Sequence, residues 1–409
     1  AIASARPSTL DPNAAQLHRY APGSEAVFLT ELAAALAGED RPGRTEAISD
    51  LAGLLRDGGE DVVIVWSERI GSEAAAALAR VAALLGLDGR DGAGVLEIPS
   101  GANGRGLREA GVRPDCGPGL APLPGEALGR DAPAIAQAAA DGELTALYLF
   151  GTDPIRDQPD RALWETALHS AALVVAHASI LTEGLREHAS VIFPAESYAE
   201  KEGTVVHPDG RLQRQRIAIA HPDEVRSGWA VVAALASRAG VDIDARHSTD
   251  VFADLVAAVP FYEGLTVDEI GGRGVRWPER ESAAAAANQV ADDAVSEESF
   301  AAAGPALPNE GELRLGTYRP IWAAPECEIS PALKFLIPDQ QLELAPSDAD
   351  WLGIAHGDEV TVAQNGTRIN AKAFVRSSVP AGSAFLADGI EGEQSANALT
   401  EPLIEVHKA

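Results

Sequence analysis

The chain has 409 residues, of which 46% are hydrophobic, and carries a formal net charge of −29 from 61 acidic and 32 basic side chains. This length and composition predict a globular protein of two or three domains. The negative charge argues against a nucleic-acid partner, because nucleic-acid binding needs clustered positive charge. No apolar run approaches the roughly 18 residues that span a bilayer, so direct membrane insertion is not expected.

The two cysteines, Cys116 and Cys327, lie far apart in the sequence. They cannot provide the four thiolates of an iron–sulfur cluster, and they do not form the CxxC spacing of a zinc site. We therefore expect two free buried thiols, no cluster and no metal site in this chain.

The first 47 residues predict one strand, a proline-rich loop and one helix, as in the tail of a preceding α/β lobe. The chain begins without methionine and contains none. We therefore expect it to be a fragment of a longer product.

Residues 48–279 have the pattern of an α/β domain. Short apolar runs predict strands at 62–66, 94–98, 146–150, 173–177 and 190–193, and helical periodicity predicts helices at 72–85, 160–169 and 228–238. The strand runs are apolar almost throughout, which favours burial on both faces and an open, mostly parallel sheet.

The composition changes twice in the last third of the chain. Residues 280–308 are rich in Ala, Glu, Ser and Asp, which predicts a linker. Residues 309–409 alternate apolar and polar positions, and Asn365-Gly366 between two such runs is a strong hairpin signal. This region predicts a small β-barrel.

The segment 189–213 combines several turn signals with a dense charge cluster. A strand-like run ends at Pro194, acidic and basic residues follow, and Gly203 and Gly210 frame a hairpin. These residues by themselves are also typical of an exposed connection with solvated charges. The turn GTDP at 151–154 directly follows a strand, at the edge where open α/β sheets bind ligands, although an ordinary strand-to-helix turn also fits it.

These motifs, with AEKEGT at 199–204 and YEGLTVDEIGGRGVRWP at 262–278, resemble the molybdopterin oxidoreductase superfamily. The likeness is greatest to the large G-type subunit of NADH:quinone oxidoreductase, respiratory complex I. It covers nearly the whole chain and implies an open, mostly parallel sheet of that type, followed by a C-terminal double-psi β-barrel. It also implies a cofactor pocket between the sheet edge and the barrel. Its residues would be Gly151, Thr152, Asp153, Glu202, Gly203, Thr204, Arg211, Gln213 and Arg319.

Three positions depart from the family pattern. Asp153 and His207 stand where family members commonly have asparagine, and Arg319 is followed by Ile321 and Trp322 without the usual histidine. A carboxylate at position 153 would repel phosphate. We therefore expect a vestigial pocket that holds two domains together, with no cofactor bound in this chain.

The resemblance implies a structural C-terminal portion of that complex I subunit. Such a portion would support electron transfer from NADH to quinone without a redox centre of its own, and the iron–sulfur clusters would lie in an N-terminal part. Its partners would be other subunits of the peripheral arm, and its location would be cytoplasmic, peripheral to the membrane through the complex.

Two other functions remain open. The chain could be the cofactor-binding region of an active molybdopterin oxidoreductase such as formate dehydrogenase, with a molybdopterin guanine dinucleotide. It could also be a free-standing protein that reuses the fold for binding. No residue is assigned a catalytic role, and fold alone does not establish catalysis.

Overall fold

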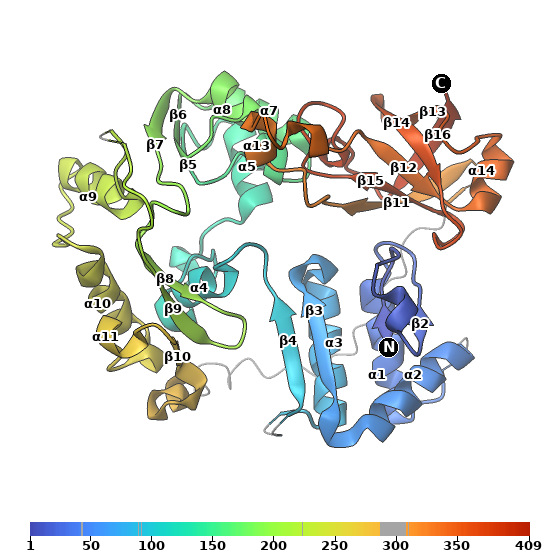
Figure 1. Ribbon diagram of the computed structural model, residues 1–409, viewed down its shortest axis with the longest axis horizontal. Helices are drawn as coiled ribbons and strands as arrows, with labels where there is room; N and C mark the ends of the chain where they lie inside the picture. The colour runs from blue at the N-terminus through green and yellow to red at the C-terminus, as the bar shows by residue number, and fades with distance from the viewer. Residues whose placement is uncertain (42–43, 89, 91, 223, 287–307, 310) are drawn as a thin grey trace.

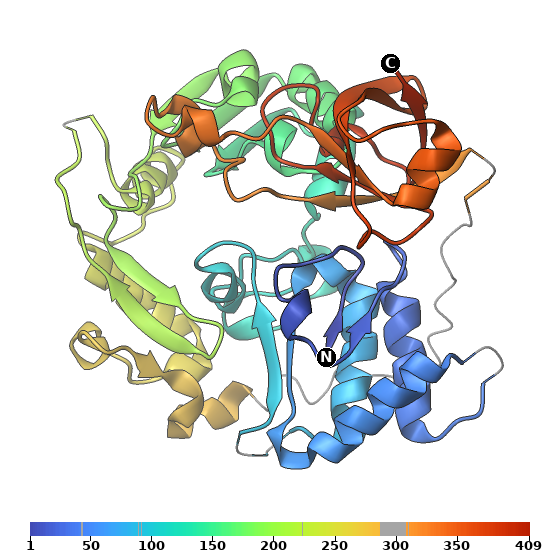
Figure 2. The ribbon, with the colours of Figure 1, turned by 45° about the vertical axis from the view of Figure 1, so that its right-hand side comes forward.

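The computed structural model describes residues 1–41, 44–88, 90, 92–222, 224–286, 308–309 and 311–409. Four lobes follow one another around a ring that is best seen in Figure 2. We call them the N-terminal lobe (1–98), the central lobe (131–196), the hairpin lobe (101–120 and 203–286) and the barrel (312–409).

The N-terminal lobe contains two pairs of parallel strands and three helices (Figure 1). The strands are β1 (Ile2–Ala3) with β2 (Leu17–His18), and β3 (Val63–Ser67) with β4 (Gly94–Ile98). The helices are α1 (Glu25–Ala37), α2 (Glu46–Gly58) and α3 (Gly71–Leu85). Leu32, Leu51 and Val81, one from each helix, share a buried core. Residues 1–47 therefore pack with the residues that follow them.

The central lobe is a three-stranded parallel sheet of β5 (Ala146–Phe150), β6 (Leu173–Ala178) and β7 (Val191–Pro194). Its helices are α5 (Ala132–Ala140), α6 (Pro154–Asp157), α7 (Arg161–Ser170) and α8 (Glu183–His188). Leu149, Trp164 and Ala176 belong to the core between the sheet and the helices.

The expected strands form, but they belong to two separate parallel sheets. The prediction that both faces of the strands are buried is wrong. Val65 of β3 is 60% exposed and Phe150 of β5 is 52% exposed. Helices cover one face of the central sheet, whereas the face that carries Phe150 is covered only in part, by the start of α9 at Gly228.

The hairpin lobe is built on an antiparallel sheet of β8 (Gly203–Val206), β9 (Arg211–Gln215) and β10 (Val275–Arg276). Helices α4 (Gly104–Glu109), α9 (Gly228–Arg238), α10 (Ser248–Ala258) and α11 (Val267–Ile270) accompany it. Phe252, Tyr262 and Trp277 lie in its core. The hairpin expected between Gly203 and Gly210 is confirmed.

The last hundred residues form a closed six-stranded barrel in the order β11-β15-β12-β14-β13-β16. The strands are β11 (Glu312–Tyr318), β12 (Gln341–Leu344), β13 (Glu359–Gln364), β14 (Thr367–Val375), β15 (Ser383–Ala387) and β16 (Leu403–Lys408), and α13 (Pro325–Ile329) and α14 (Pro346–Leu352) lie in the connections. Asn365 and Gly366 have positive φ angles of 48° and 90° and join β13 to β14. The expected hairpin and the expected fold class, parallel α/β followed by a double-psi barrel, are confirmed.

Most of the predicted linker at 280–308 lies outside the described residues. The boundaries at 47/48, 279/280 and 308/309 stay predictions. Among the helices that the structure describes, we find none with the length and apolarity required to cross a membrane.

Candidate functional site

The turn GTDP lies at the carboxyl edge of the central sheet, directly after β5. Gly151 has a φ of 69°, which favours glycine, and its amide donates to the His177 carbonyl of β6 at 2.8 Å. Apart from its two chain neighbours, no described residue has an atom within 4 Å of the place where a side chain would begin at Gly151. The turn therefore presents an open backbone surface at the edge where ligands bind to such sheets.

Asp153 points inward from this turn and is buried. Its carboxylate accepts hydrogen bonds from the amide of Ile155 (3.1 Å), the hydroxyl of Thr182 (2.6 Å) and the amide of Gly184 (3.0 Å). A side chain at Gly184 would begin 2.3 Å from Asp153 Oδ1, so only glycine fits there. Asp153 therefore ties the turn after β5 to the turn after β6.

We expect Asp153→Ala to lower stability by about 1–3 kcal/mol, because alanine leaves three buried donors without an acceptor. Asp153→Asn should lower it by less, because asparagine keeps one acceptor oxygen but turns its NH2 group toward a donor. Urea unfolding followed by hydrogen exchange of residues 151–157 checks this. Equal loss in both variants would contradict the structural role.

The turn forms one wall of a cleft of about 130 Å³ between the central lobe and the barrel. The other walls are the turn after β6 and the start of α13. The polar lining residues are Thr152, Asp153, Arg156, Asp157, Ser179, Thr182 and Glu326. Asp153 and Arg156 bind groups inside the protein, whereas the carboxylates of Asp157 and Glu326 can accept hydrogen bonds, so the cleft favours ligand groups that donate them.

A buried ion pair joins the two lobes beside this cleft. Arg156 donates to both carboxylate oxygens of Glu328 at 2.8 and 2.7 Å, and to the Gly389 carbonyl at 2.5 Å. Asn397 donates to the carbonyl of Ile155 at 2.8 Å. Sequence reasoning missed Arg156 and Glu328, because nothing local links two residues 172 positions apart.

Arg319 reaches the same junction from the end of β11. Its guanidinium lies 3.5 Å from Asp157 and 3.9 Å from Asp388, and it donates to the Arg156 carbonyl at 3.4 Å. The side chain is exposed. Of the nine predicted site residues, the structure thus brings Gly151, Thr152, Asp153 and Arg319 together.

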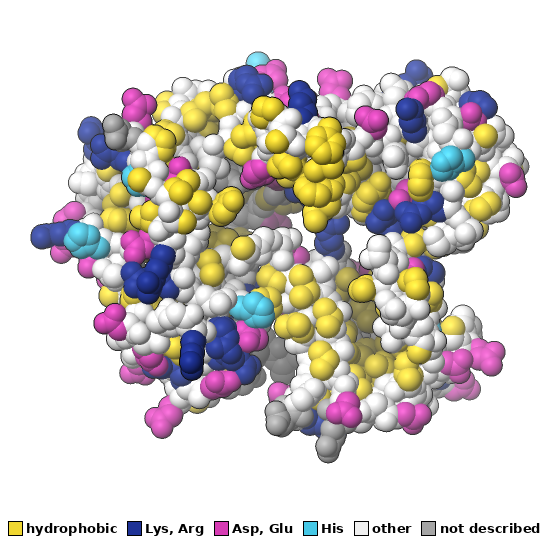
Figure 3. Space-filling view, in the orientation of Figure 1, with side chains coloured by type: hydrophobic (Ala, Val, Ile, Leu, Met, Phe, Trp, Pro, Cys, Tyr) yellow, Lys and Arg dark blue, Asp and Glu magenta, His cyan; other side chains and the backbone are white. Residues whose placement is uncertain are grey.

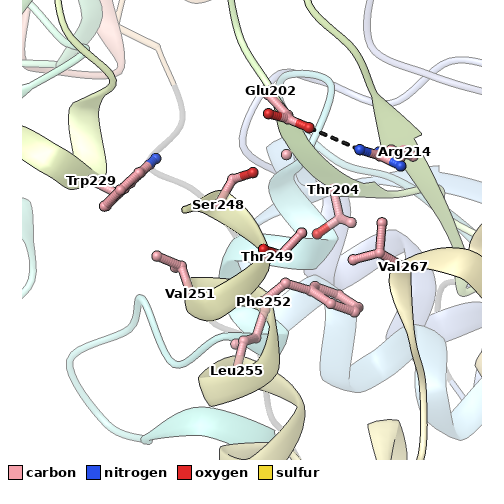
Figure 4. Close-up of a pocket in the computed structure, with 11 residues that line it drawn as sticks. Glu202, Thr204, Arg214, Trp229, Ser248, Thr249, Val251, Phe252, Leu255 and Val267 are labelled. Atoms are coloured by element: carbon pink, nitrogen blue, oxygen red, sulfur yellow. Dashed lines mark hydrogen bonds and ion pairs between the residues drawn. The ribbon is translucent and has the colours of Figure 1, made fainter. Parts of the chain in front are cut away.

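Glu202, Gly203 and Thr204 line a different cavity, also of about 130 Å³ (Figure 4). Its other walls come from α10, from Trp229 of α9, from Arg214 of β9 and from Val267 of α11. Glu202 accepts a hydrogen bond from Arg214 at 2.9 Å. This cavity and the cleft at the barrel share no lining residue.

Arg211 and Gln213 lie on β9, in neither cavity. A side chain at Gly274 would begin about 3.0 Å from Arg211 and 3.1 Å from Gln213, so both pack beside that glycine. That the nine residues form one cofactor pocket stays a prediction. The structure places them at three separate positions.

His177 lies at the carboxyl end of β6, next to the GTDP turn. It is buried, its ring contacts Phe150 edge-on with centroids 4.7 Å apart, and Nδ1 lies 3.3 Å from the Tyr148 hydroxyl. Burial lowers its pKa below the usual 6.5, with a nearby Lys201 acting in the same direction and Glu196 opposing it. Glu196 itself is buried and accepts from Ser227 at 2.8 Å and from the amide of Gly228 at 3.2 Å.

We expect the difference in the His177 pKa between the folded and the unfolded chain to make the free energy of unfolding depend on pH. The unfolded chain takes up the His177 proton more readily than the folded chain. The stabilisation is therefore complete above about pH 6.5 and is lost as the pH falls through the lower folded pKa, with a slope of at most about 1.4 kcal/mol per pH unit. His177→Asn should flatten the loss between pH 7 and 5 in urea titrations, whereas His407→Asn, at an exposed site, should not. An unchanged slope in His177→Asn would refute this.

Two family models match the chain. The model described as molybdopterin oxidoreductase matches residues 65–238, and the molybdopterin dinucleotide binding domain matches residues 328–409. The chain belongs to the molybdopterin oxidoreductase family. The Arg156–Glu328 ion pair joins these two matched regions of the molybdopterin oxidoreductase chain.

Curated relatives agree with this assignment. The NADH-quinone oxidoreductase G subunit 2 of Rhizobium meliloti is 27% identical over 94% of this chain and 48% of its own length. The alpha subunit of NADPH-Fe(3+) oxidoreductase of Geobacter sulfurreducens is 28% identical over 91% of this chain and 44% of its own. The alpha subunit of F420-dependent formate dehydrogenase 1 of Methanococcus maripaludis is 28% identical over 48% of this chain and 32% of its own. The predicted resemblance to the G-type subunit is confirmed, and the chain spans less than half the length of these relatives.

Among solved structures, acetylene hydratase from Pelobacter acetylenicus superposes with a TM-score of 0.62. The match covers 100% of this chain and 73% of that one, at 12% sequence identity. This likeness supports the fold of the molybdopterin oxidoreductase chain and carries no statement about its activity.

The prediction that no cofactor binds in this chain is wrong. The matches to the molybdopterin oxidoreductase and dinucleotide binding models point to a molybdopterin cofactor bound in this chain. The structure also removes one ground for that prediction. The Asp153 carboxylate is turned inward onto three hydrogen-bond donors, which stabilise its charge and occupy its oxygens within the protein.

Proposed function

We propose that this chain is the molybdopterin-dinucleotide-binding part of a large subunit in a multi-subunit oxidoreductase related to NADH-quinone oxidoreductase. One observation supports it above all. The cleft at the carboxyl edge of the central sheet is bounded by the start of α13, and beside it the Arg156–Glu328 ion pair joins the two family-matched regions. The cofactor supplies the redox chemistry, and the protein binds and orients it.

The side chains at this cleft fit the nucleoside end of such a cofactor. Asp157 and Glu326 can accept hydrogen bonds from ribose hydroxyl and base amino groups. Arg319 is the nearby cation for a phosphate, and its pairing with Asp157 and Asp388 at 3.5 and 3.9 Å is loose enough to be exchanged. Because the cleft is smaller than the roughly 300–1,000 Å³ of ordinary ligand pockets, most of the cofactor must contact surfaces beyond it.

The proposed partner subunits and cellular location rest on the same similarity to NADH-quinone oxidoreductase. We propose that the other subunits are those of a peripheral arm like that of complex I, on the cytoplasmic side of the membrane. The iron–sulfur clusters predicted for an N-terminal part would lie in the portion of the relatives that this chain does not span.

The test is to purify the full-length protein and measure its molybdenum and tungsten content and its pterin fluorescence after oxidation. We expect one pterin dinucleotide per chain. Ser179→Trp, which fills the cleft from an exposed position, should lower the pterin content at least tenfold, whereas Ser378→Trp on the barrel surface should not. Absence of pterin from the wild-type protein would refute the function, and full pterin content in Ser179→Trp would refute the site.

A further inference from the structure

The N-terminal lobe contains an open groove of about 740 Å³. Strand β1 lies along one side and β3 along the other, with α1, α2 and α3 behind them (Figures 1 and 2). The groove is several times larger than the cleft at the barrel, and it shares no lining residue with that cleft or with the cavity of the hairpin lobe.

The groove is lined mainly by apolar side chains. Its floor consists of Phe28, Leu29, Leu32, Leu51, Leu55 and Val81. On the β3 side, Val63 and Val65 are 53% and 60% exposed. Figure 3 shows apolar side chains gathered over the lower centre of the molecule, where β3 and β4 lie in Figure 1. Large exposed apolar surfaces of this kind mark places where another apolar surface docks.

The backbone on both sides of the groove is unpaired as well. In the described part of the chain, β1 pairs with β2 and β3 pairs with β4, and neither β1 nor β3 has a neighbour on its other edge. A free strand edge presents a row of amides and carbonyls that can pair with a further strand. A strand between β1 and β3 would join the two pairs into one sheet across α1 and α3.

We propose that this groove takes up a β-strand from the part of the polypeptide outside these 409 residues. The two relatives that match almost all of this chain align with it over only 48% and 44% of their own length, so they contain ample further chain. A strand in the groove would pair with the free edges of β1 and β3 and would also cover Val63 and Val65. A small apolar ligand could fill the groove but would leave both rows of backbone groups unpaired. The proposal is independent of the cofactor site.

Thiol labelling of two matched valine positions tests the proposal. Val65→Cys lies in the groove, and Val241→Cys lies in the hairpin lobe, with exposures of 60% and 59% in the parent chain. The native Cys116 and Cys327 are buried and give a slow background. We expect equal maleimide labelling in the 409-residue chain. In the full-length polypeptide, labelling of Val65→Cys should slow at least tenfold while Val241→Cys stays within twofold.

Hydrogen exchange of the β3 amides identifies the occupant. A paired strand must slow their exchange in the full-length polypeptide at least tenfold. If Val65→Cys is protected while the β3 amides exchange as before, a helix or a ligand covers the groove and the proposal is wrong. Unchanged labelling in the full-length polypeptide also overturns it. Protection that appears in the 409-residue chain on raising its concentration would identify a second copy as the occupant instead.

Discussion

Replacing Glu109 by alanine is expected to destabilise the hairpin lobe by about 3–5 kcal/mol. Glu109 is buried at the end of α4 and accepts hydrogen bonds from Arg105 (2.8 Å), Trp277 (3.1 Å) and the Tyr262 hydroxyl. Burial of the phenol and the negative charge of Glu109 raise the pKa of Tyr262, so this hydroxyl remains a donor. Alanine leaves the buried Tyr262 and Trp277 donors without an acceptor and removes the charge partner of Arg105.

Hydrogen exchange of residues 104–109 and 260–277 measures this effect without assuming that the whole chain unfolds in one step. Glu109→Gln keeps the shape and one acceptor oxygen, and should lose less than Glu109→Ala. Glu279→Ala is the control, because this exposed residue pairs with Arg276 at the surface and should cost less than about 1 kcal/mol. Wild-type exchange in Glu109→Ala would show that the three contacts do not hold the lobe together.

Arg156→Met is expected to weaken the docking of the barrel on the central lobe by about 3–5 kcal/mol, because it leaves the Glu328 carboxylate buried without its partner. The double variant Arg156→Met with Glu328→Leu removes both charges and should recover much of this loss. Urea unfolding monitored by hydrogen exchange in α6 and α13 reports the docking.

The surface pair Arg130 and Glu143 provides the matched control. Its atoms also lie 2.8 Å apart, but the side chains are 47% and 59% exposed. Arg130→Met should therefore cost less than about 1 kcal/mol. A similar loss in Arg156→Met and Arg130→Met, or no recovery in the double variant, would contradict a role for the buried pair in joining the lobes.

Much of the local structure could be predicted from the sequence. The β-branched runs at 62–66 and 173–177 are strands, and Asn365-Gly366 turns a hairpin, because these signals depend on a few neighbouring residues. The position of GTDP at a sheet edge also follows from its place directly after a strand. The prediction that both strand faces are buried failed for a physical reason. An apolar run shows that a strand has side chains suited to burial, but it does not show whether another element covers them.

The chemical role of individual side chains could not be read in this way. Asp153 was interpreted as a charge facing a ligand, yet its partners Thr182 and Gly184 stand about thirty positions further along the chain and draw it inward. Gly151 directly follows β5, whereas Glu202 directly precedes β8 of the hairpin and lines a cavity on another lobe.

The sequence by itself determined the secondary structure elements, the order of the α/β region and the barrel, and the likeness to molybdopterin oxidoreductases, because propensity, periodicity and motifs are local properties. Only the tertiary structure decided that Arg156 meets Glu328, that the predicted site residues lie at three positions, and that β1 and β3 face each other across an open groove. These facts depend on contacts between residues far apart in the chain, which a single sequence does not record.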